Sequence, residues 1–326
     1  MAMVLQVPMA LAPSTTEPLS LPMVEVISTS LLPGLGTPIQ DVPANVQVHT
    51  SQDMARQRPV SLADYLEQNS TGISINSAQG NPFQPNLSFR GFTASPLLGQ
   101  PQGLSVFQDG VRINEPFGDV VNWDLIPHSA ISSLQLLPGS HPGFGLNTLG
   151  GALSLQTKSG LTHPGGSVSL HGGSFARRAV EFEQGGSQGN WNYFLTGNLF
   201  QDQGWAEHNP SQVQQFFGKV GYTTGQSSVD VSLTVADNTL KGSQTLPQSF
   251  SSQIRQAYTY PDQNKNRLNF LNIKGSHLLN DRMFLDGNVY VRQYRNQNIS
   301  SNVNGNYDGV SDLVQATNDR SIFKKR

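Results

Sequence analysis

The stretch that decides the fold reads GNPFQPNLSFRGF at residues 80–92, continues as VFQDGV at residues 106–111 and ends as GGALSLQTK at residues 150–158. Its glycines punctuate short apolar runs, and Gly supplies the positive φ that tight turns need. The Asp109-Gly110 pair is a hairpin-turn signal. Strands are expected at residues 87–89, 104–108 and 133–137. The stretch therefore predicts a compact module of short strands.

Two short helices are predicted ahead of this stretch, at residues 51–58 and 61–68. Residues 61–64 read SLAD, which fits a capping box, and Leu62, Tyr65 and Leu66 form an apolar stripe. Helices and strands mixed within about 140 residues indicate an α+β domain of ordinary size.

The hydrophobic period changes to two from Gly165 onward. Apolar and polar residues alternate at residues 168–171, 180–183, 229–235 and 285–292. Such segments are strands with one apolar and one polar face. The pattern is interrupted by Phe194, Phe200, Phe217 and Leu271. In a soluble β-sandwich the apolar faces would meet in a core, whereas in a membrane barrel they would face lipid.

The lengths of the connections favour the membrane barrel. Short turns are expected at residues 185–189, 223–227 and 277–282, and long connections at residues 201–212, 236–266 and 295–314. Outer-membrane barrels have short periplasmic turns and longer extracellular loops. The turn at residues 172–177 is an exception, because it is short on the side of the long connections.

Composition excludes several classes of protein. The chain has 326 residues, of which 36% are hydrophobic and only 13% charged, so uncharged polar residues fill much of it. A net charge of -2 gives no basic field for nucleic acid. The absence of cysteine excludes a disulfide framework and thiolate metal sites.

The sequence predicts no transmembrane helix, because it contains no apolar window of about 18 residues. Any membrane span must therefore be a β-strand. Residues 1–12 are apolar and end in Ala-Leu-Ala, like a signal-peptidase site, but lack a basic start. Residues 1–22 are thus either the remnant of an export signal or a disordered linker.

The order and spacing of three motifs carry a resemblance to a known family. Arg90-Gly91-Phe92, Asp109-Gly110-Val111 and the run from Gly143 to Gly151 resemble the plug domain of TonB-dependent outer-membrane receptors. The resemblance extends over residues 23–326 and is strongest over 72–160. It implies a mainly β membrane protein, with an α+β plug domain at residues 23–161. Antiparallel strands of an incomplete transmembrane β-barrel would follow at residues 162–326.

The resemblance also implies a partner for the β-prone run MVEVIST at residues 23–29. This run resembles the TonB box, which pairs with a strand of the periplasmic protein TonB through backbone hydrogen bonds. The TonB-binding residues would be Val24, Glu25, Val26, Ile27 and Ser28.

A plug-barrel ion pair is implied for Arg90, because such receptors pair a plug arginine with carboxylates of the inner barrel wall. Glu181 and Glu183 are candidate partners. The family often carries a second arginine where this chain has Pro138, which cannot form an ion pair.

Three plug loops, at residues 77–86, 93–103 and 114–123, would point outward by the same resemblance. They offer aromatic platforms and hydrogen-bonding groups that suit a chelate or a sugar, although loop residues also often cap turns. The ligand-binding candidates are Phe83, Gln84, Gln100, Gln102, Glu115, Phe117, Asp119, Asn122 and Trp123.

Motifs of catalysis are missing from the sequence. It has no phosphate-binding loop and no His-Glu-x-x-His, and Gly143-Phe144-Gly145 lacks the third glycine of a dinucleotide fingerprint. His128, His141, His163 and His171 have no ligand-like spacing. We expect no enzyme activity, no metal site and no cofactor.

These expectations define an uptake receptor in the outer membrane of a Gram-negative bacterium. It would bind a scarce extracellular ligand, an iron-siderophore complex above all, and import it when TonB and its inner-membrane energising complex open the plug. About seven wall strands are expected, whereas plugged transporters have about 22. We therefore expect a fragment that does not function alone.

Two alternatives remain open at this point. The first is a soluble periplasmic or secreted β-rich binding protein, for example for carbohydrate. The second is a remnant that transports nothing.

Overall fold

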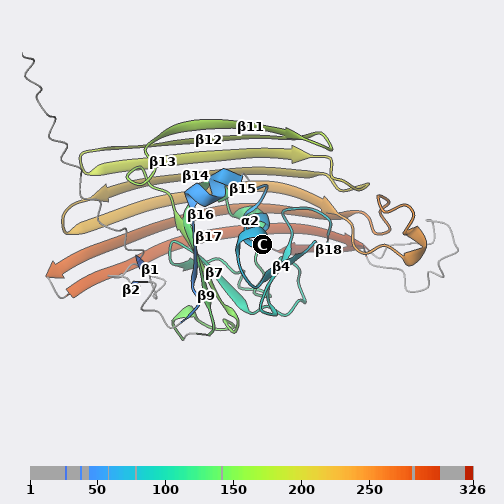
Figure 1. Cartoon of the computed structure of the whole chain (residues 1–326), viewed down its shortest axis with the longest axis horizontal. Coiled ribbons are helices and arrows are strands. Elements are labelled where there is room, and N and C mark those ends of the chain that lie inside the picture. The colour runs from blue at the N-terminus through green and yellow to red at the C-terminus, as the bar shows by residue number, and fades with distance from the viewer. Residues whose placement is uncertain are drawn as a thin grey trace, which may run out of the picture.

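The computed structural model of the chain describes residues 26–27, 37–38, 44–57, 59–77, 79–140, 142–280, 283–301 and 320–325. Two units make up most of it (Figure 1). We call residues 44–158 the N-terminal unit. The long strands that follow form one sheet, which we call the wall.

The N-terminal unit is built on a five-stranded sheet of order β3-β9-β10-β7-β8. Strands β7 and β10 are parallel, and the other neighbours are antiparallel. A second sheet has the order β4-β5-β6. The strands are β3 Gln47–Thr50, β4 Ile73–Asn76, β5 Asn86–Phe89, β6 Phe92–Ala94, β7 Leu104–Gln108, β8 Val111–Arg112, β9 Ile131–Pro138 and β10 Gly151–Thr157.

The helices of this unit confirm the sequence prediction closely. They are α1 Ser51–Gln57 and α2 Leu62–Asn69, followed by the 3-10 helices η2 Trp123–Leu125, η3 His128–Ala130 and η4 Pro142–Phe144. The Ser61 hydroxyl accepts a hydrogen bond from the Asp64 backbone N–H at 3.2 Å, as a cap should. The apolar stripe of α2 is buried in the main core, beside Phe89, Val106 and Leu134.

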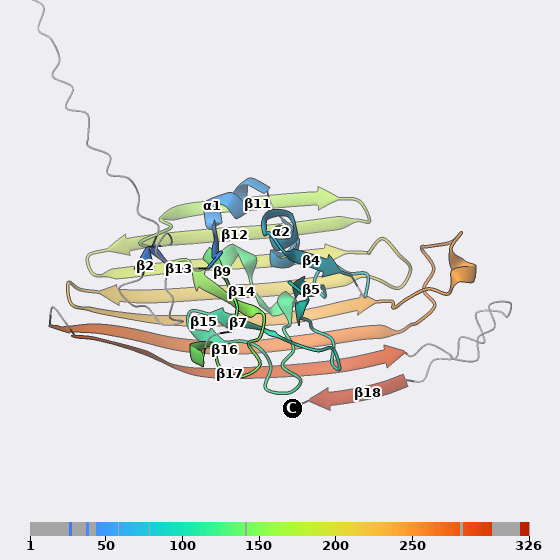
Figure 2. The same cartoon turned by 60° about the horizontal axis from the view of Figure 1, so that its bottom comes forward.

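The wall is an antiparallel sheet of eight strands in sequence order, from β11 at one edge to β18 at the other. Figures 1 and 2 show the N-terminal unit against one face of this sheet, which we call its inner face. The strands are β11 Gly165–Gly173, β12 Arg177–Gln188, β13 Trp191–Asp202, β14 Ser211–Thr223, β15 Ser227–Gly242, β16 Asp262–Asn280, β17 Met283–Ser301 and β18 Arg320–Lys325.

The predicted alternation places apolar side chains on the outer face of the wall. Val168 is 71% exposed and Val289 73%, and Val229, Val231 and Leu233 also lie on this face. These side chains do not meet a second sheet in the described residues, unlike those of a soluble sandwich. An exposed apolar band of this kind suits contact with lipid.

The aromatic residues that interrupt the alternation have a physical explanation. Phe194 and Phe217 are buried together with Ala130 of η3, and Phe200 is buried against Phe83. Their rings lie on the inner face because the N-terminal unit covers them there. Leu271 belongs to the outer face and keeps the pattern, since it is paired with Leu233.

The strands run further than the sequence predicts. The expected connection at residues 236–266 is reduced to 243–261, because β15 extends to Gly242 and β16 begins at Asp262. In this extension the outer face carries polar residues such as Asp237 and Lys265, so the alternation is lost although the backbone ladder continues. The short turns at 189–190 and 224–226 lie at one end of the sheet, and the connections at 203–210 and 243–261 lie at the other, together with the short turn between β11 and β12 (Figure 1).

Two further observations concern the chain outside these units. Strand β1 Val26–Ile27 pairs antiparallel with β2 Thr37–Pro38. Among the described residues, none of the helices is long and apolar enough to cross a membrane.

Candidate functional site

Several charged side chains form ion pairs across the interface between the N-terminal unit and the wall. The Arg292 guanidinium of β17 donates to both oxygens of Glu115, each at 2.9 Å. Their side chains are only 11% and 4% exposed. Lys158 Nζ contacts both oxygens of Glu183 at 2.7 and 2.8 Å. The two parallel hydrogen bonds of the Arg292–Glu115 pair fix orientation as well as contributing energy.

Asp109 joins the β7–β8 hairpin to the wall. The hairpin turn is confirmed, with φ of 48° at Asp109 and 88° at Gly110. The carboxylate accepts hydrogen bonds from the Thr157 backbone and hydroxyl, and Lys219 Nζ lies 3.4 Å away. Burial alone would raise the pKa of Asp109, but Lys219, Lys274 and the Thr157 bonds hold it below its usual value. Asp109 is therefore a charged anchor.

Asp124 of η2 is fully buried at the same interface, and amides surround it. Asn238 Nδ2 donates to a carboxylate oxygen at 2.8 Å, and Asn266 Nδ2 donates to both oxygens at 3.0 Å. The backbone carbonyl of Asp124 accepts from Gln215 Nε2 and Asn238 Nδ2, each at 2.7 Å. Burial raises the pKa of Asp124 to about 6, despite these hydrogen bonds.

The 3-10 helix η3 provides a third contact with the wall. His128 Nε2 lies 3.1 Å from Glu181, and the Thr196 hydroxyl donates to Ser129 Oγ at 2.8 Å. Next to them Ala130 packs on Phe194 and Phe217. The interface is thus a mixture of ion pairs, amide hydrogen bonds and apolar contacts, and the main core of the N-terminal unit extends to Ala236, Leu268 and Phe270 of the wall.

The ion pair expected for Arg90 is not among those of the described residues. Arg90 is exposed, has a φ of 52°, and its guanidinium carbon lies 5.1 Å from the centre of the Phe89 ring. Glu181 and Glu183 do bind the N-terminal unit, but through His128 and Lys158. The sequence thus predicted the two wall carboxylates, but it did not predict His128 and Lys158 as their partners.

The structure places most of the predicted ligand-binding residues in packing or hydrogen-bonding roles, which corrects the expectation of accessible side chains there. Phe83 packs on Phe200 with ring centres 4.8 Å apart. The Trp123 indole N–H donates to the Ala94 carbonyl from within the core. The remaining residues in such roles are Gln84 bonded to Asn81, Gln102 to Ser95, Glu115 to Arg292, Asp119 to Arg112 and Asn147, and Asn122 to Glu115.

Two predicted ligand-binding residues keep exposed side chains. Phe117 is 63% exposed and Gln100 is exposed as well. Of the residues expected to bind TonB, the structure describes Val26 and Ile27, which form β1. Val24, Glu25 and Ser28 lie outside the described residues.

The loop at residues 79–84 contacts the long connections of the wall. The Gly80 carbonyl accepts from Trp205 Nε1 at 3.1 Å and Asn209 Nδ2 at 2.7 Å. His208 stacks on Tyr260 with ring centres 4.1 Å apart. Aromatic and hydrogen-bonding groups of two wall loops therefore gather beside this loop, and none of them is among the ligand-binding residues predicted from the sequence.

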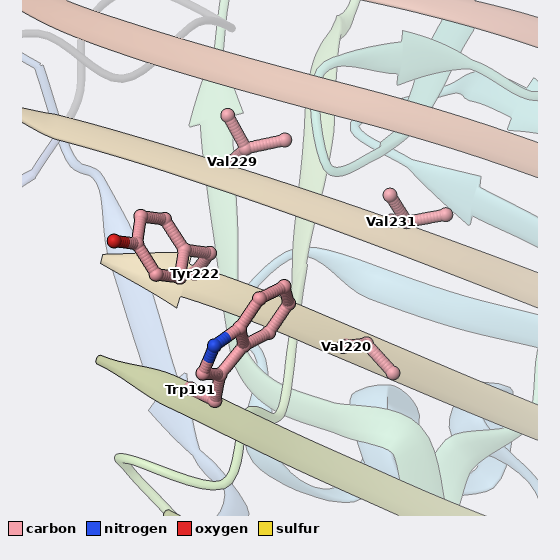
Figure 3. Close-up of a pocket in the computed structure, with 5 residues that line it drawn as sticks. All are labelled: Trp191, Val220, Tyr222, Val229 and Val231. Atoms are coloured by element: carbon pink, nitrogen blue, oxygen red, sulfur yellow. The ribbon is translucent and has the colours of Figure 1, made fainter. Parts of the chain in front are cut away.

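A pocket of about 340 Å³ lies on the outer face of the wall. Its lining residues are Trp191, Val220, Tyr222, Val229 and Val231 (Figure 3). The Trp191 and Tyr222 rings lie 4.8 Å apart, next to the short turns. Aromatic residues at this height suit the interfacial belt of a membrane barrel rather than a site for a polar ligand. The described residues contain no group of three or more side chains that could hold a metal.

The Glu115–Arg292 pair gives a stability prediction. Replacing Arg292 by Ala leaves a carboxylate buried without its cation, which costs on the order of 3–5 kcal/mol. Urea unfolding followed by tryptophan fluorescence should show that loss, and adding Glu115→Gln should recover part of it. As a control, Arg267→Ala removes the exposed pair with Asp237 and should change stability by about 1 kcal/mol or less. Equal losses for both arginines would contradict the anchoring role.

Known proteins are similar to this chain in sequence and in architecture. A family model described as TonB-dependent Receptor Plug Domain matches residues 38–152. The chain is 26% identical over 165 residues to the ferrichrome outer membrane transporter/phage receptor of Escherichia coli K12. That match covers 49% of this chain and 21% of the transporter.

Solved structures show the same fold. The closed form of the ferric-catecholate import receptor of E. coli K12 aligns with a TM-score of 0.69 and 14% identity, over 91% of this chain and 45% of that one. The ferric preacinetobactin receptor of Acinetobacter baumannii aligns with a TM-score of 0.67 and 14% identity, over 85% and 42%. The chain thus spans less than half the length of these receptors. Residues 38–152 thus match the plug domain of the TonB-dependent receptors, and the chain has the fold of these outer-membrane proteins, with the N-terminal unit in the place of the plug and the wall in the place of barrel strands.

Proposed function

We propose that this chain is part of an uptake receptor, which as a complete protein binds a scarce extracellular ligand and imports it when TonB opens the plug, and that the chain does not function alone. The observation that carries the proposal is the seating of the plug on the inner face of the wall through separable contacts. The Arg292–Glu115 and Lys158–Glu183 pairs and the amides around Asp124 are polar contacts that can exchange their partners for water, although Ala236, Leu268 and Phe270 of the wall also join the main core of the plug.

The ligand we propose is an iron-siderophore complex. The relatives named above are a ferrichrome transporter, a ferric-catecholate import receptor and a ferric preacinetobactin receptor. In this chain the ligand would contact the loop at residues 79–84 and the aromatic groups beside it, among them Trp205 and Tyr260, at the end with the long connections. Exposed Gln100 and Phe117 would add contacts from the plug.

Energy would enter at the other end of the plug. We propose that the Val24–Ser28 segment pairs with TonB as an added strand, since β1 shows that Val26 and Ile27 adopt extended pairing. No bond in the ligand needs to be broken, so binding and release suffice for the function.

Titration with ferric chelates tests the ligand proposal. The protein in detergent should bind one class of ferric chelate, hydroxamate, catecholate or citrate, with a Kd of about 1 µM or tighter. Cells that display a complete receptor containing this chain should take up radiolabelled iron from the same chelate. Trp205→Ala should weaken binding about tenfold or more, as for an aromatic anchor. Trp191→Ala, on the lipid-facing side, is the matched control and should change nothing. Binding of a sugar or of cobalamin instead would contradict an iron ligand.

A further inference from the structure

Three successive wall strands each contribute one amide to Asp124. Gln215 comes from β14, Asn238 from β15 and Asn266 from β16, and Asn238 and Asn266 are directly paired across the sheet. Each amide is itself oriented. Gln215 Oε1 accepts from Asn198 at 3.1 Å, and Asn238 Oδ1 accepts from the Gln214 backbone at 3.0 Å. The seat is therefore built to donate hydrogen bonds to Asp124.

The groups that face Asp124 include no cation in direct contact among the described residues. From the wall come Gln215, Asn238 and Asn266, and β17 adds the Tyr294 hydroxyl, which donates to Asn266 Oδ1 at 3.1 Å. From the plug, Glu115 adds an unfavourable negative charge. Arg292 is engaged by Glu115 through both oxygens.

The other buried acids of the plug are different. Glu115 is paired with Arg292, and Asp109 lies 3.4 Å from Lys219. Burying a charge without a countercharge costs free energy that neutral hydrogen bonds only partly offset. Among the plug acids buried at the wall, Asp124 is thus the one whose ionised form strains the closed state.

We propose that Asp124 is a positioning residue that keeps the closed plug releasable, because its buried charge weakens the seat that the wall amides build around it. This inference rests on the proposed gating function. It assigns Asp124 the regulation of plug release, and it implies that protonation or neutralisation of this one side chain tightens closure.

The sign of the pH dependence follows from the raised pKa. Asp124 titrates at about 6 in the seated plug, against an ordinary value of 3.8 when water reaches it after release. The seated state therefore binds the proton more tightly. Its extra stability is complete below the lower pKa and is lost as the pH rises through about 6. A difference of roughly two pKa units corresponds to about a hundredfold in the seating equilibrium.

Hydrogen exchange of the plug segment at residues 120–130 measures this equilibrium directly. The purified protein in detergent is compared with Asp124→Asn, both in a His128→Gln background, which removes the His128–Glu181 contact of the same segment from the comparison. After correction for intrinsic exchange, protection in the Asp124 protein should fall about tenfold between pH 5 and pH 8, because only part of the full difference lies above pH 5. The Asp124→Asn protein should stay highly protected across this range.

The matched control is Asp237→Asn, which removes a carboxylate next to Asn238 on the exposed face of β15 and should leave the profile unchanged. Protection that is flat with pH in the Asp124 protein, or lower in Asp124→Asn, would overturn the proposal. The measurement needs neither ligand nor TonB. A failure of iron uptake with the expected exchange profile would therefore count against the proposed function alone.

Discussion

Deletion of residues 24–28 is expected to abolish uptake and to leave ligand binding unchanged. The five residues form the segment proposed to add a strand to TonB, and backbone hydrogen bonds would supply most of that affinity. Without the segment, TonB could not bind the receptor and could not transmit energy from its inner-membrane complex to the plug. The groups proposed to bind ligand lie at the far end of the plug, so their contacts should survive.

A point substitution sharpens the same prediction. Ile27→Pro removes one backbone N–H and fixes φ, which is incompatible with a central position in a paired strand. It should reduce uptake to background, whereas Ile27→Val keeps the backbone and should transport normally. Uptake of iron in whole cells and chelate binding to isolated membranes are measured in parallel. Loss of binding along with uptake would contradict the assignment of this segment to TonB.

The sequence was sufficient for the architecture because two local signals are strong. The alternation of apolar and polar residues over β11–β17 indicates an apolar face, whatever that face contacts. The glycines of the plug motifs indicate where its turns lie. The capping box at Ser61 and the turn at Asp109-Gly110 were foreseen for the same reason. Both depend on neighbours along the chain.

The partners of the interface could not be foreseen, because they come from strands far apart in sequence. Asp124 meets Asn238 and Asn266, more than a hundred positions away. The only indication of this contact in the sequence is that β15 and β16 carry asparagines at positions that face the plug. Arg90 is not among the ion pairs of the described residues, where His128 and Lys158 contact the wall carboxylates Glu181 and Glu183.

Trp123 and Phe83 illustrate a second limit of sequence reasoning. Both lie in Gly- and Pro-rich segments that resemble surface loops, and both were expected to face ligand. The structure buries them, Trp123 in the plug core and Phe83 against Phe200. Large aromatic side chains gain about 1.5–3 kcal/mol from burial, which outweighs the loop-like character of their surroundings.

A disulfide between plug and wall would test directly whether the plug must leave its seat. Ser129 of η3 and Thr196 of β13 are in hydrogen-bond contact at 2.8 Å, and the sequence has no cysteine that could compete. The Ser129→Cys, Thr196→Cys double variant can therefore form one defined bond across the interface. The single Ser129→Cys variant controls for the loss of the hydroxyl.

Iron uptake by this double variant, measured before and after reduction, is the decisive experiment. The oxidised protein should bind the ferric chelate normally but import it at background rate, and reduction should restore import to the rate of the single variant. Full-rate import by protein that is completely crosslinked would contradict the account, because the plug would then not need to separate from the wall.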